Sequence, residues 1–207
     1  MAIKQEQFTE LLLQALEHER GGVQVYEAAL RCAVNDDLIE EWQEYHDQTL
    51  THVKLLEGVC KELAIDPEQP SLGREIIQSL GAALVGAMEK ALGGGNRDAA
   101  QLAACECVVL AETKDHLDWE LLEKCSEHLT GAEKKSLTAA VDEVEDEEDE
   151  HLYHSKGWCR ELWIESLGMK AILPPPEEEK EVKTAIGAAR AEQEADKERG
   201  RKGAKKY

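Results

Sequence analysis

The stretch that decides the fold is residues 144–152, which read V-E-D-E-E-D-E-H-L. As a helix, this stretch continues an apolar stripe with spacings of three and four residues, and Glu148 falls in the middle of the stripe with His151 beside it. A carboxylate in such a position is costly unless it is paired, protonated or bound to a metal ion. Because the i, i+3 spacing places both side chains on one helical face, Glu148 and His151 are the first candidate metal ligands.

Apolar residues recur at helical spacing in three other long segments, so the sequence predicts an all-α fold. Two short connections, at Asn35-Asp36-Asp37 and at Thr130-Gly131, predict two antiparallel hairpins. A long crossover between the hairpins is expected to contain a short extra helix over about 74–92, closed by three glycines. The four long helices are expected at about 8–34, 37–63, 97–127 and 132–167.

The run Pro174-Pro175-Pro176 marks an expected domain boundary, because proline cannot continue a helix. Residues 1–173 are therefore predicted to form the bundle. Residues 174–207 are predicted to be a charged, flexible tail with too little apolar surface to dock firmly, although part of it, about 182–195, could become transiently helical.

The formal net charge of -20 lies in the bundle, because residues 177–207 hold nine basic and eight acidic side chains. Such an acidic surface repels phosphate backbones and anionic lipid, so we expect no nucleic-acid and no membrane partner, whereas cations are attracted. Neither a secretory signal nor a transmembrane stretch is visible in the sequence, which predicts a cytoplasmic protein. The six cysteines lie within helical patterns and are expected to be reduced thiols.

The first and third long helices each offer a glutamate for the same site. Glu19 occupies the middle of the first apolar stripe, while Glu106 and Glu112 both have apolar neighbours on the third helix. An internal repeat, E-x6-aromatic-E-x4-C, favours Glu112 as the partner of Glu19, with Glu106 held in reserve. The repeat comprises Glu19, Tyr26, Glu27 and Cys32 in one helix and Glu112, Trp119, Glu120 and Cys125 in the other.

The second helix departs from this pattern. Its stripe contains Thr49-x-x-His52 where Glu148-x-x-His151 would predict another glutamate. The imidazole is present and the carboxylate is missing, so one of two metal positions is expected to be weaker.

These motifs resemble the ferritin-like superfamily, and are nearest to bundles of the bacterioferritin and rubrerythrin type, over residues 8–167. The resemblance implies a ferritin-like four-helix bundle with a di-iron or di-manganese centre that reacts with oxygen or peroxide. Five of the six usual ligands are matched, and Tyr26, seven residues after Glu19, is implied as a catalytic residue. The implied metal ligands are Glu19, His52, Glu112, Glu148 and His151.

Two functional hypotheses follow. The first is a metal-dependent oxidoreductase or iron-handling protein that holds one or two ions and assembles as a homo-oligomer. The second is a non-catalytic scaffold or assembly protein, whose degenerate site has lost a ligand at Thr49 and whose buried acids are satisfied by hydrogen bonds.

Overall fold

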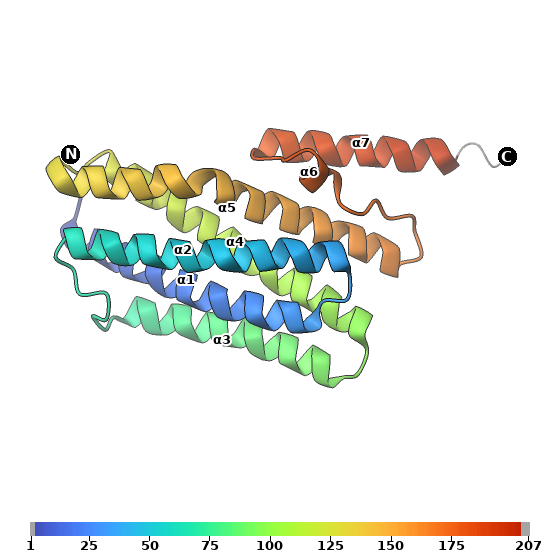
Figure 1. The fold of residues 1–207 in the computed structure, drawn as a ribbon, viewed down its shortest axis with the longest axis horizontal. Helices are drawn as coiled ribbons and strands as arrows, with labels where there is room; N and C mark the ends of the chain where they lie inside the picture. Colours follow the sequence, from blue (N-terminus) through green and yellow to red (C-terminus); the bar gives the residue numbers. More distant parts are fainter. Residues whose placement is uncertain (1–2, 204–207) are drawn as a thin grey trace.

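The structure is a computed structural model that describes the backbone of residues 3–203 and the side chains of residues 3–200. Its elements are all helices, and five long ones form the body of the molecule (Figure 1). The predicted all-α fold class is therefore confirmed. The helices are α1 (Gln5–Cys32), α2 (Asp36–Glu62), α3 (Leu72–Gly93), α4 (Arg97–Ser126), α5 (Gly131–Ser166), α6 (Pro176–Glu179) and α7 (Ala185–Gly203).

Three of the helices begin at side chains that cap free backbone N–H groups. Asn35 accepts a hydrogen bond from the Leu38 N–H at the start of α2, and Asn96 accepts one from the Ala99 N–H at the start of α4. Ser71 caps α3 in the same way. A short polar side chain at this position satisfies a donor that has no partner inside the helix, which fixes where each helix starts.

The helices α1 and α2 form one hairpin and α4 and α5 form the other, while α3 crosses between them and packs against α1 and α4. With 22 residues, α3 is longer than the short helix predicted. It approaches α1 closely, since a Cβ atom added to Gly81 would lie 3.7 Å from the Cα atom of Gly21. The small residues of this crossover therefore allow two helix backbones to meet.

Two apolar clusters fill the bundle and leave its middle to polar side chains. One cluster contains Tyr26, Trp42 and Trp158 at the end where α1 meets α2. The other contains Leu16 and Leu137 at the opposite end. The polar residues between them are consequently shielded from water at both ends of the bundle.

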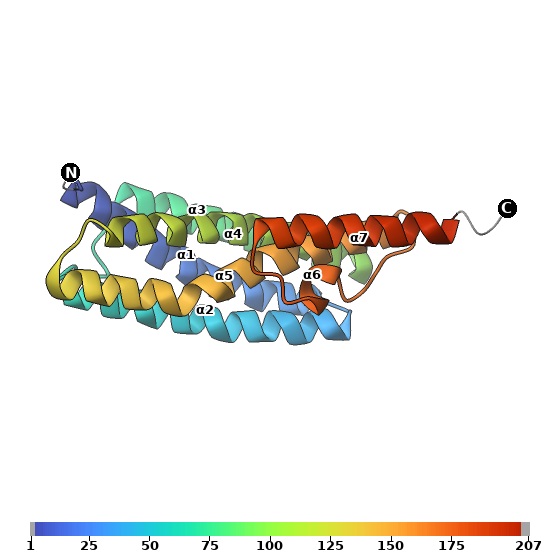
Figure 2. The same ribbon diagram turned by 90° about the horizontal axis from the view of Figure 1, so that it is seen from above.

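The C-terminal segment, residues 174–203, packs more extensively than the sequence predicts. Its helix α6 contacts α5 and α7, and α7 lies beside α5 (Figures 1 and 2). Val182, Ala191 and Ala195 are buried, and so is the carboxylate of Glu177. The expectation of too little docking surface is wrong for this segment, whereas the domain boundary at residue 173 stays a prediction.

Ion pairs explain why the C-terminal segment docks although its apolar pattern does not predict this. Arg160 on α5 donates two hydrogen bonds to Glu177, with distances of 2.7 and 2.9 Å. Arg199 on α7 donates to the buried carboxylate of Glu161, with distances of 2.6 and 2.8 Å. Paired arginine and carboxylate groups of this kind are geometrically specific, so they position the segment although it has few large apolar side chains.

Replacing Gly157 with alanine is expected to weaken this docking. The new Cβ atom would lie 2.7 Å from Glu177 Oε2 and 2.9 Å from Pro175 Cβ, so α6 would have to move. Overpacking typically costs about 1–3 kcal/mol. Limited proteolysis should cut the C-terminal segment faster in this variant. Gly58→Ala is the matched control, because nothing lies within 4 Å of its added Cβ, and equal cleavage of the two variants would contradict the prediction.

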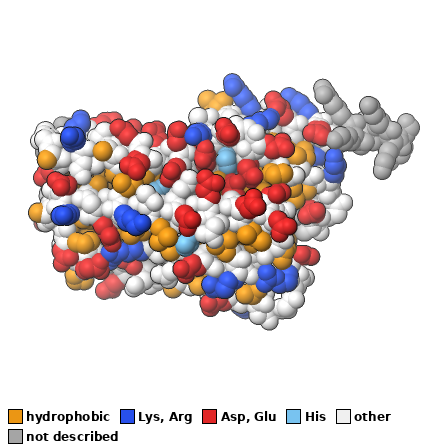
Figure 3. Space-filling model, viewed as in Figure 1, with side chains coloured by type: hydrophobic (Ala, Val, Ile, Leu, Met, Phe, Trp, Pro, Cys, Tyr) orange, Lys and Arg blue, Asp and Glu red, His pale blue; other side chains and the backbone are white. Residues whose placement is uncertain are grey.

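Acidic side chains dominate the face seen in Figure 3, with histidines visible among them. On this face the acidic side chains are spread along the length of the bundle. Within the described residues, no helix combines the length and apolar character needed to cross a membrane.

Candidate metal centre

The five predicted ligands meet in the middle of the bundle as two triads that share one carboxylate. Glu148 belongs to both triads. All five side chains are buried, with at most 3% of any of them exposed. The triads are Glu19, His52 and Glu148, and Glu112, Glu148 and His151.

The first triad joins three helices. His52 on α2 places its Nδ1 atom 3.2 Å from Glu148 Oε1 and 3.4 Å from Glu19 Oε1. Nitrogen and anionic oxygen atoms converge here at distances that an ion could fill, and both donor types suit iron.

The second triad has the same kind of arrangement, with one histidine beside two glutamates. His151 Nδ1 lies 3.5 Å from Glu112 Oε2 and 3.6 Å from Glu148 Oε1. The two imidazole rings stack with centroids 5.7 Å apart. The Nδ1 atom of each histidine therefore points at its carboxylates.

The other nitrogen of each ring is held by a side chain from the opposite hairpin. Glu147 on α5 lies 2.8 Å from His52 Nε2, and Gln48 on α2 lies 2.7 Å from His151 Nε2. Such partners orient a metal-binding imidazole and fix its tautomer. Gln48 directly precedes Thr49, and Glu147 directly precedes Glu148 at the equivalent position. Each hairpin therefore holds the histidine of the other in the same way, as pseudo-twofold symmetry requires.

The internal repeat in the sequence also has a structural explanation. Trp119 on α4 donates a hydrogen bond of 2.7 Å to Glu19 Oε1, and Tyr26 on α1 donates one of 2.8 Å to Glu112 Oε1. Each aromatic residue thus holds one oxygen of the glutamate on the partner helix. The second oxygen of each glutamate stays available to an ion.

The atoms left without hydrogen-bond partners test whether a metal fits these residues. Among the described residues, the buried side-chain atoms with no such partner include Glu19 Oε2, Glu112 Oε2, His52 Nδ1 and both oxygens of Glu148. Leaving buried acceptors unsatisfied is costly, and native structures rarely do so without a reason. Because these atoms converge on one another, the residues present fit a metal site.

The electrostatics of the site agree with a place for cations. Burial raises the pKa of Glu148 to about 7, although His52 and His151 act in the opposite direction. Burial would lower the pKa of His52, but the carboxylate neighbours Glu19 and Glu147 raise it well above its usual value. Without metal, the site therefore keeps protons that a divalent ion would replace.

Thr49 occupies the position at which the sequence pattern lacks a carboxylate. Its side chain is buried, and its hydroxyl donates a hydrogen bond of 2.7 Å to the Tyr45 carbonyl oxygen. Its methyl carbon, Cγ2, would lie 3.3 Å from a Cβ atom added to Gly22. Thr49 is thus a packed residue whose hydroxyl is already engaged.

Sequence reasoning missed four residues around the site: Gln48, Asp115, Trp119 as a hydrogen-bond donor, and Glu147. A helical wheel could have found Asp115, since it lies three residues after Glu112 and four before Trp119 on the same face. The roles of Gln48 and Glu147 depend on contacts between helices and leave no local signal.

Glu106, the glutamate held in reserve, and His116, another polar side chain of α4, have partners outside the triads. Glu106 is exposed and accepts a hydrogen bond of 3.2 Å from Trp163 Nε1. His116 pairs with Asp149 at 2.9 Å. Glu112 is therefore the glutamate of this helix that reaches the site, while the catalytic role of Tyr26 stays a prediction.

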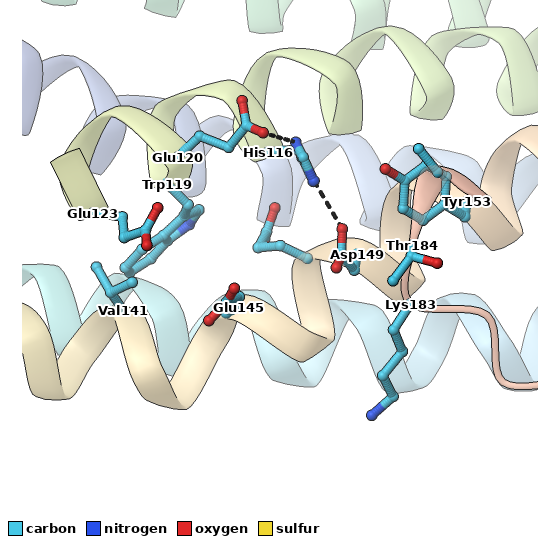
Figure 4. Close-up of a pocket in the computed structure, with 12 residues that line it drawn as sticks. His116, Trp119, Glu120, Glu123, Val141, Glu145, Asp149, Tyr153, Lys183 and Thr184 are labelled. Atoms are coloured by element: carbon cyan, nitrogen blue, oxygen red, sulfur yellow. Dashed lines mark hydrogen bonds and ion pairs between the residues drawn. The ribbon is translucent and has the colours of Figure 1, made fainter. Parts of the chain in front are cut away.

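A cavity of about 280 Å³ opens between α4, α5 and residues 183–185 and reaches Glu148. Figure 4 shows His116 and Asp149 joined across it, with Trp119 and Glu145 on its wall. Five acids line the cavity, together with apolar side chains such as Trp119 and Val141. The carboxylate shared by the two triads thus lies beside a cavity rich in acids.

The fold and the paired triads, which share Glu148, define a four-helix bundle of the ferritin-like superfamily. A family model described as Ubiquinone biosynthesis protein COQ7 matches residues 17–159, so the chain belongs to this family. The match spans every residue of both triads.

The family has a di-iron centre and oxidoreductase chemistry, so an iron-dependent function is supported at this coarse level. Manganese, the other metal implied by the resemblance, receives no support. No curated protein matches the chain significantly. No solved structure matches it significantly either.

Proposed function

We propose that this protein is an iron-dependent oxidoreductase that reacts with oxygen or peroxide at the site between α1, α2, α4 and α5. The observation that carries the proposal is the sharing of Glu148 by two buried carboxylate and imidazole triads. Membership of the family favours hydroxylation over iron storage.

Bound ferrous iron would supply the electrons that reduce oxygen. The side chains of the protein would bind and orient the ions. Glu19 and His52 would hold one ion, Glu112 and His151 the other, and Glu148 both. Trp119 and Tyr26 orient the terminal glutamates through their hydrogen bonds. Burial and the hydrogen bond to Glu112 hold Tyr26 as a neutral phenol, since its pKa is raised well above the usual value.

A second cavity, of about 250 Å³, is the place we propose for an organic substrate. It lies between α1, α3 and α4, and Val25, Ile77 and Leu84 are among its mainly apolar lining residues. It also reaches Gly22, which packs against Thr49 beside the triads. A ring that carries an apolar chain, as in compounds related to ubiquinone, matches this lining better than it matches the acidic cavity.

The non-catalytic scaffold remains a second candidate because of specific contacts. Thr49 removes one expected ligand, and the hydrogen bonds from Trp119 and Tyr26 satisfy one oxygen each of Glu19 and Glu112 without a metal ion. The unpartnered oxygens of Glu148 argue against it. Cytoplasmic location and homo-oligomer formation belong to our proposal as further expectations.

Anaerobic titration of the purified protein with ferrous iron tests the proposed function. We expect tight binding of up to two ions per chain, followed by new near-ultraviolet absorbance when oxygen or peroxide is admitted. Glu148→Gln is the matched control and should abolish the signal. Failure of the wild-type chain to bind iron would refute the proposal and favour the scaffold.

A further inference from the structure

The named ligands leave a deficit of charge. Two divalent ions carry four positive charges, whereas the two triads contain three carboxylates in all. A buried excess of positive charge is unfavourable in a medium of low dielectric constant. Either one ion binds weakly, or another acid completes the set.

Asp115 on α4 is a buried acid that lies at the right level of the bundle. The contact between Trp119 and Glu19 fixes one level, and the contact between Tyr26 and Glu112 fixes the other. Along α4, Asp115 lies between Glu112 and Trp119 and on the same face. Asp115 is therefore buried on the face of α4 that carries Glu112 and Trp119, one turn from Glu112, although its carboxylate is not a member of either triad.

The carboxylate of Asp115 has no other evident role. The side chain is 4% exposed, and its Oδ1 atom has no hydrogen-bond partner among the described residues. Its electrostatic neighbours are acids: Glu19, Glu148, Glu112 and Asp118. An aspartate surrounded by acids and away from water is not explained by packing, because an apolar residue of similar size would avoid the cost.

Asp118, one turn further along α4, shows the contrast. It is equally buried, but Lys114 forms an ion pair with it. Asp118 thus has a partner within its own helix, whereas Asp115 has none.

We propose that Asp115 supplies the fourth carboxylate of the metal centre and compensates for the acid missing at Thr49. This inference rests on the proposed function, since it requires a centre with two ions. It assigns the missing charge to α4 instead of α2, so that both metal positions can be filled in a chain with only one complete E-x-x-H motif.

Asp115→Asn tests the proposal, because it keeps the shape of the side chain and removes the charge. Cobalt(II) and anaerobic ferrous iron would be titrated into the wild-type and variant proteins, with bound metal measured by elemental analysis and cobalt by its visible absorbance. We expect two ions in the wild-type chain. In the variant, one ion should bind at least about 10-fold more weakly, and the other within a few-fold of wild type.

Asp118→Asn is the control and should keep both ions, since its carboxylate is paired with Lys114. Thermal unfolding without metal shows whether each variant folds. Asp115→Asn should be at least as stable as wild type, yet gain less stability when metal is added.

Three outcomes separate the hypotheses. A folded Asp115→Asn variant that binds two ions with wild-type affinity would overturn the role of Asp115 and leave the proposed function intact. A wild-type chain that binds no metal would overturn both. Selective loss of one ion from Asp115→Asn, but not from Asp118→Asn, supports the inference.

Discussion

Replacing Glu148 with alanine is expected to weaken both metal positions together, by at least about 100-fold each. Even the loss of an outer hydrogen-bond partner typically costs about 10–100-fold in metal affinity, and Glu148 is a direct member of both triads. Equilibrium titration with ferrous iron under anaerobic conditions measures both affinities. A Glu148→Ala protein that retains one tight ion would show that the two triads do not share this ligand.

Two further variants make the result specific. Glu112→Ala should affect mainly the position that it shares with His151, because Glu112 belongs to one triad only. Glu143→Ala, which removes an exposed acid from the same helix as Glu148, should leave both affinities unchanged.

The stability of the metal-free Glu148→Leu protein separates a metal centre from a scaffold. Replacing a buried charged group by a well-packed apolar side chain is often neutral or stabilising by about 1–4 kcal/mol. We expect the leucine variant to unfold no more readily than the metal-free wild type. In contrast to wild type, it should gain no stability from iron. A large loss of stability without metal would instead indicate that Glu148 is needed for the fold itself.

The metal-free protein is expected to lose stability as the pH rises from about 5 to 8. Burial raises the pKa of Glu148 to about 7, from an ordinary value of 4.5. The folded chain therefore holds a proton that the unfolded chain has released, so the free energy of unfolding falls with pH in this range. The slope approaches about 1.4 kcal/mol per pH unit for each such proton.

Three other groups of the site, His52, His151 and Glu112, contribute with signs that follow from the direction of each pKa shift. The pKa values of His52 and His151 are raised despite burial, because of adjacent carboxylates, so their contribution is also lost as the pH rises. The pKa of Glu112 is lowered, since His151 and Tyr26 outweigh its burial. Its contribution is present above its ordinary pKa and is lost only in acid, so it does not reverse the trend from pH 5 to 8.

Urea unfolding of the metal-free protein at several pH values measures this trend. Glu148→Gln should reduce the slope, while His52 and His151 maintain the remaining part of the trend. Glu178 in α6 needs a separate control, because burial and the neighbouring Glu41 raise its pKa to about 8 and give the same sign. A midpoint that stays constant or rises between pH 5 and 8 would contradict the prediction. Added iron should stabilise the protein more at pH 8 than at pH 5.5, since the ion replaces the retained protons.

Local patterns in the sequence were sufficient for most of the fold. Asn35, Asn96 and the turn at Thr130-Gly131 mark helix ends, and the four long helices lie within a few residues of their predicted bounds. The long crossover between the two hairpins was also predicted from these local patterns. Helix ends depend on neighbouring residues and on the apolar period, both of which are visible along the chain.

The docking of residues 174–203 could not be read in this way. Arg160 and Arg199 each reach acids far along the chain, at Glu177 and Glu161 respectively. A search for apolar surface overlooks such contacts, because the carboxylates and arginines look like ordinary surface charge until the helices are placed together.

The sequence by itself determined that Glu148 and His151 share a face and that an acid in the apolar stripe needs a partner. Only the tertiary structure showed which side chains are neighbours: the contacts of Gln48 and Glu147 with the histidines of the opposite hairpin, and the burial of Asp115 without a hydrogen-bond partner for its Oδ1 atom. The physical reason is that helical periodicity fixes the direction of a side chain relative to its own axis. Which residues of different helices face each other depends on how the four helices pack. That packing cannot be read from any single segment of the sequence.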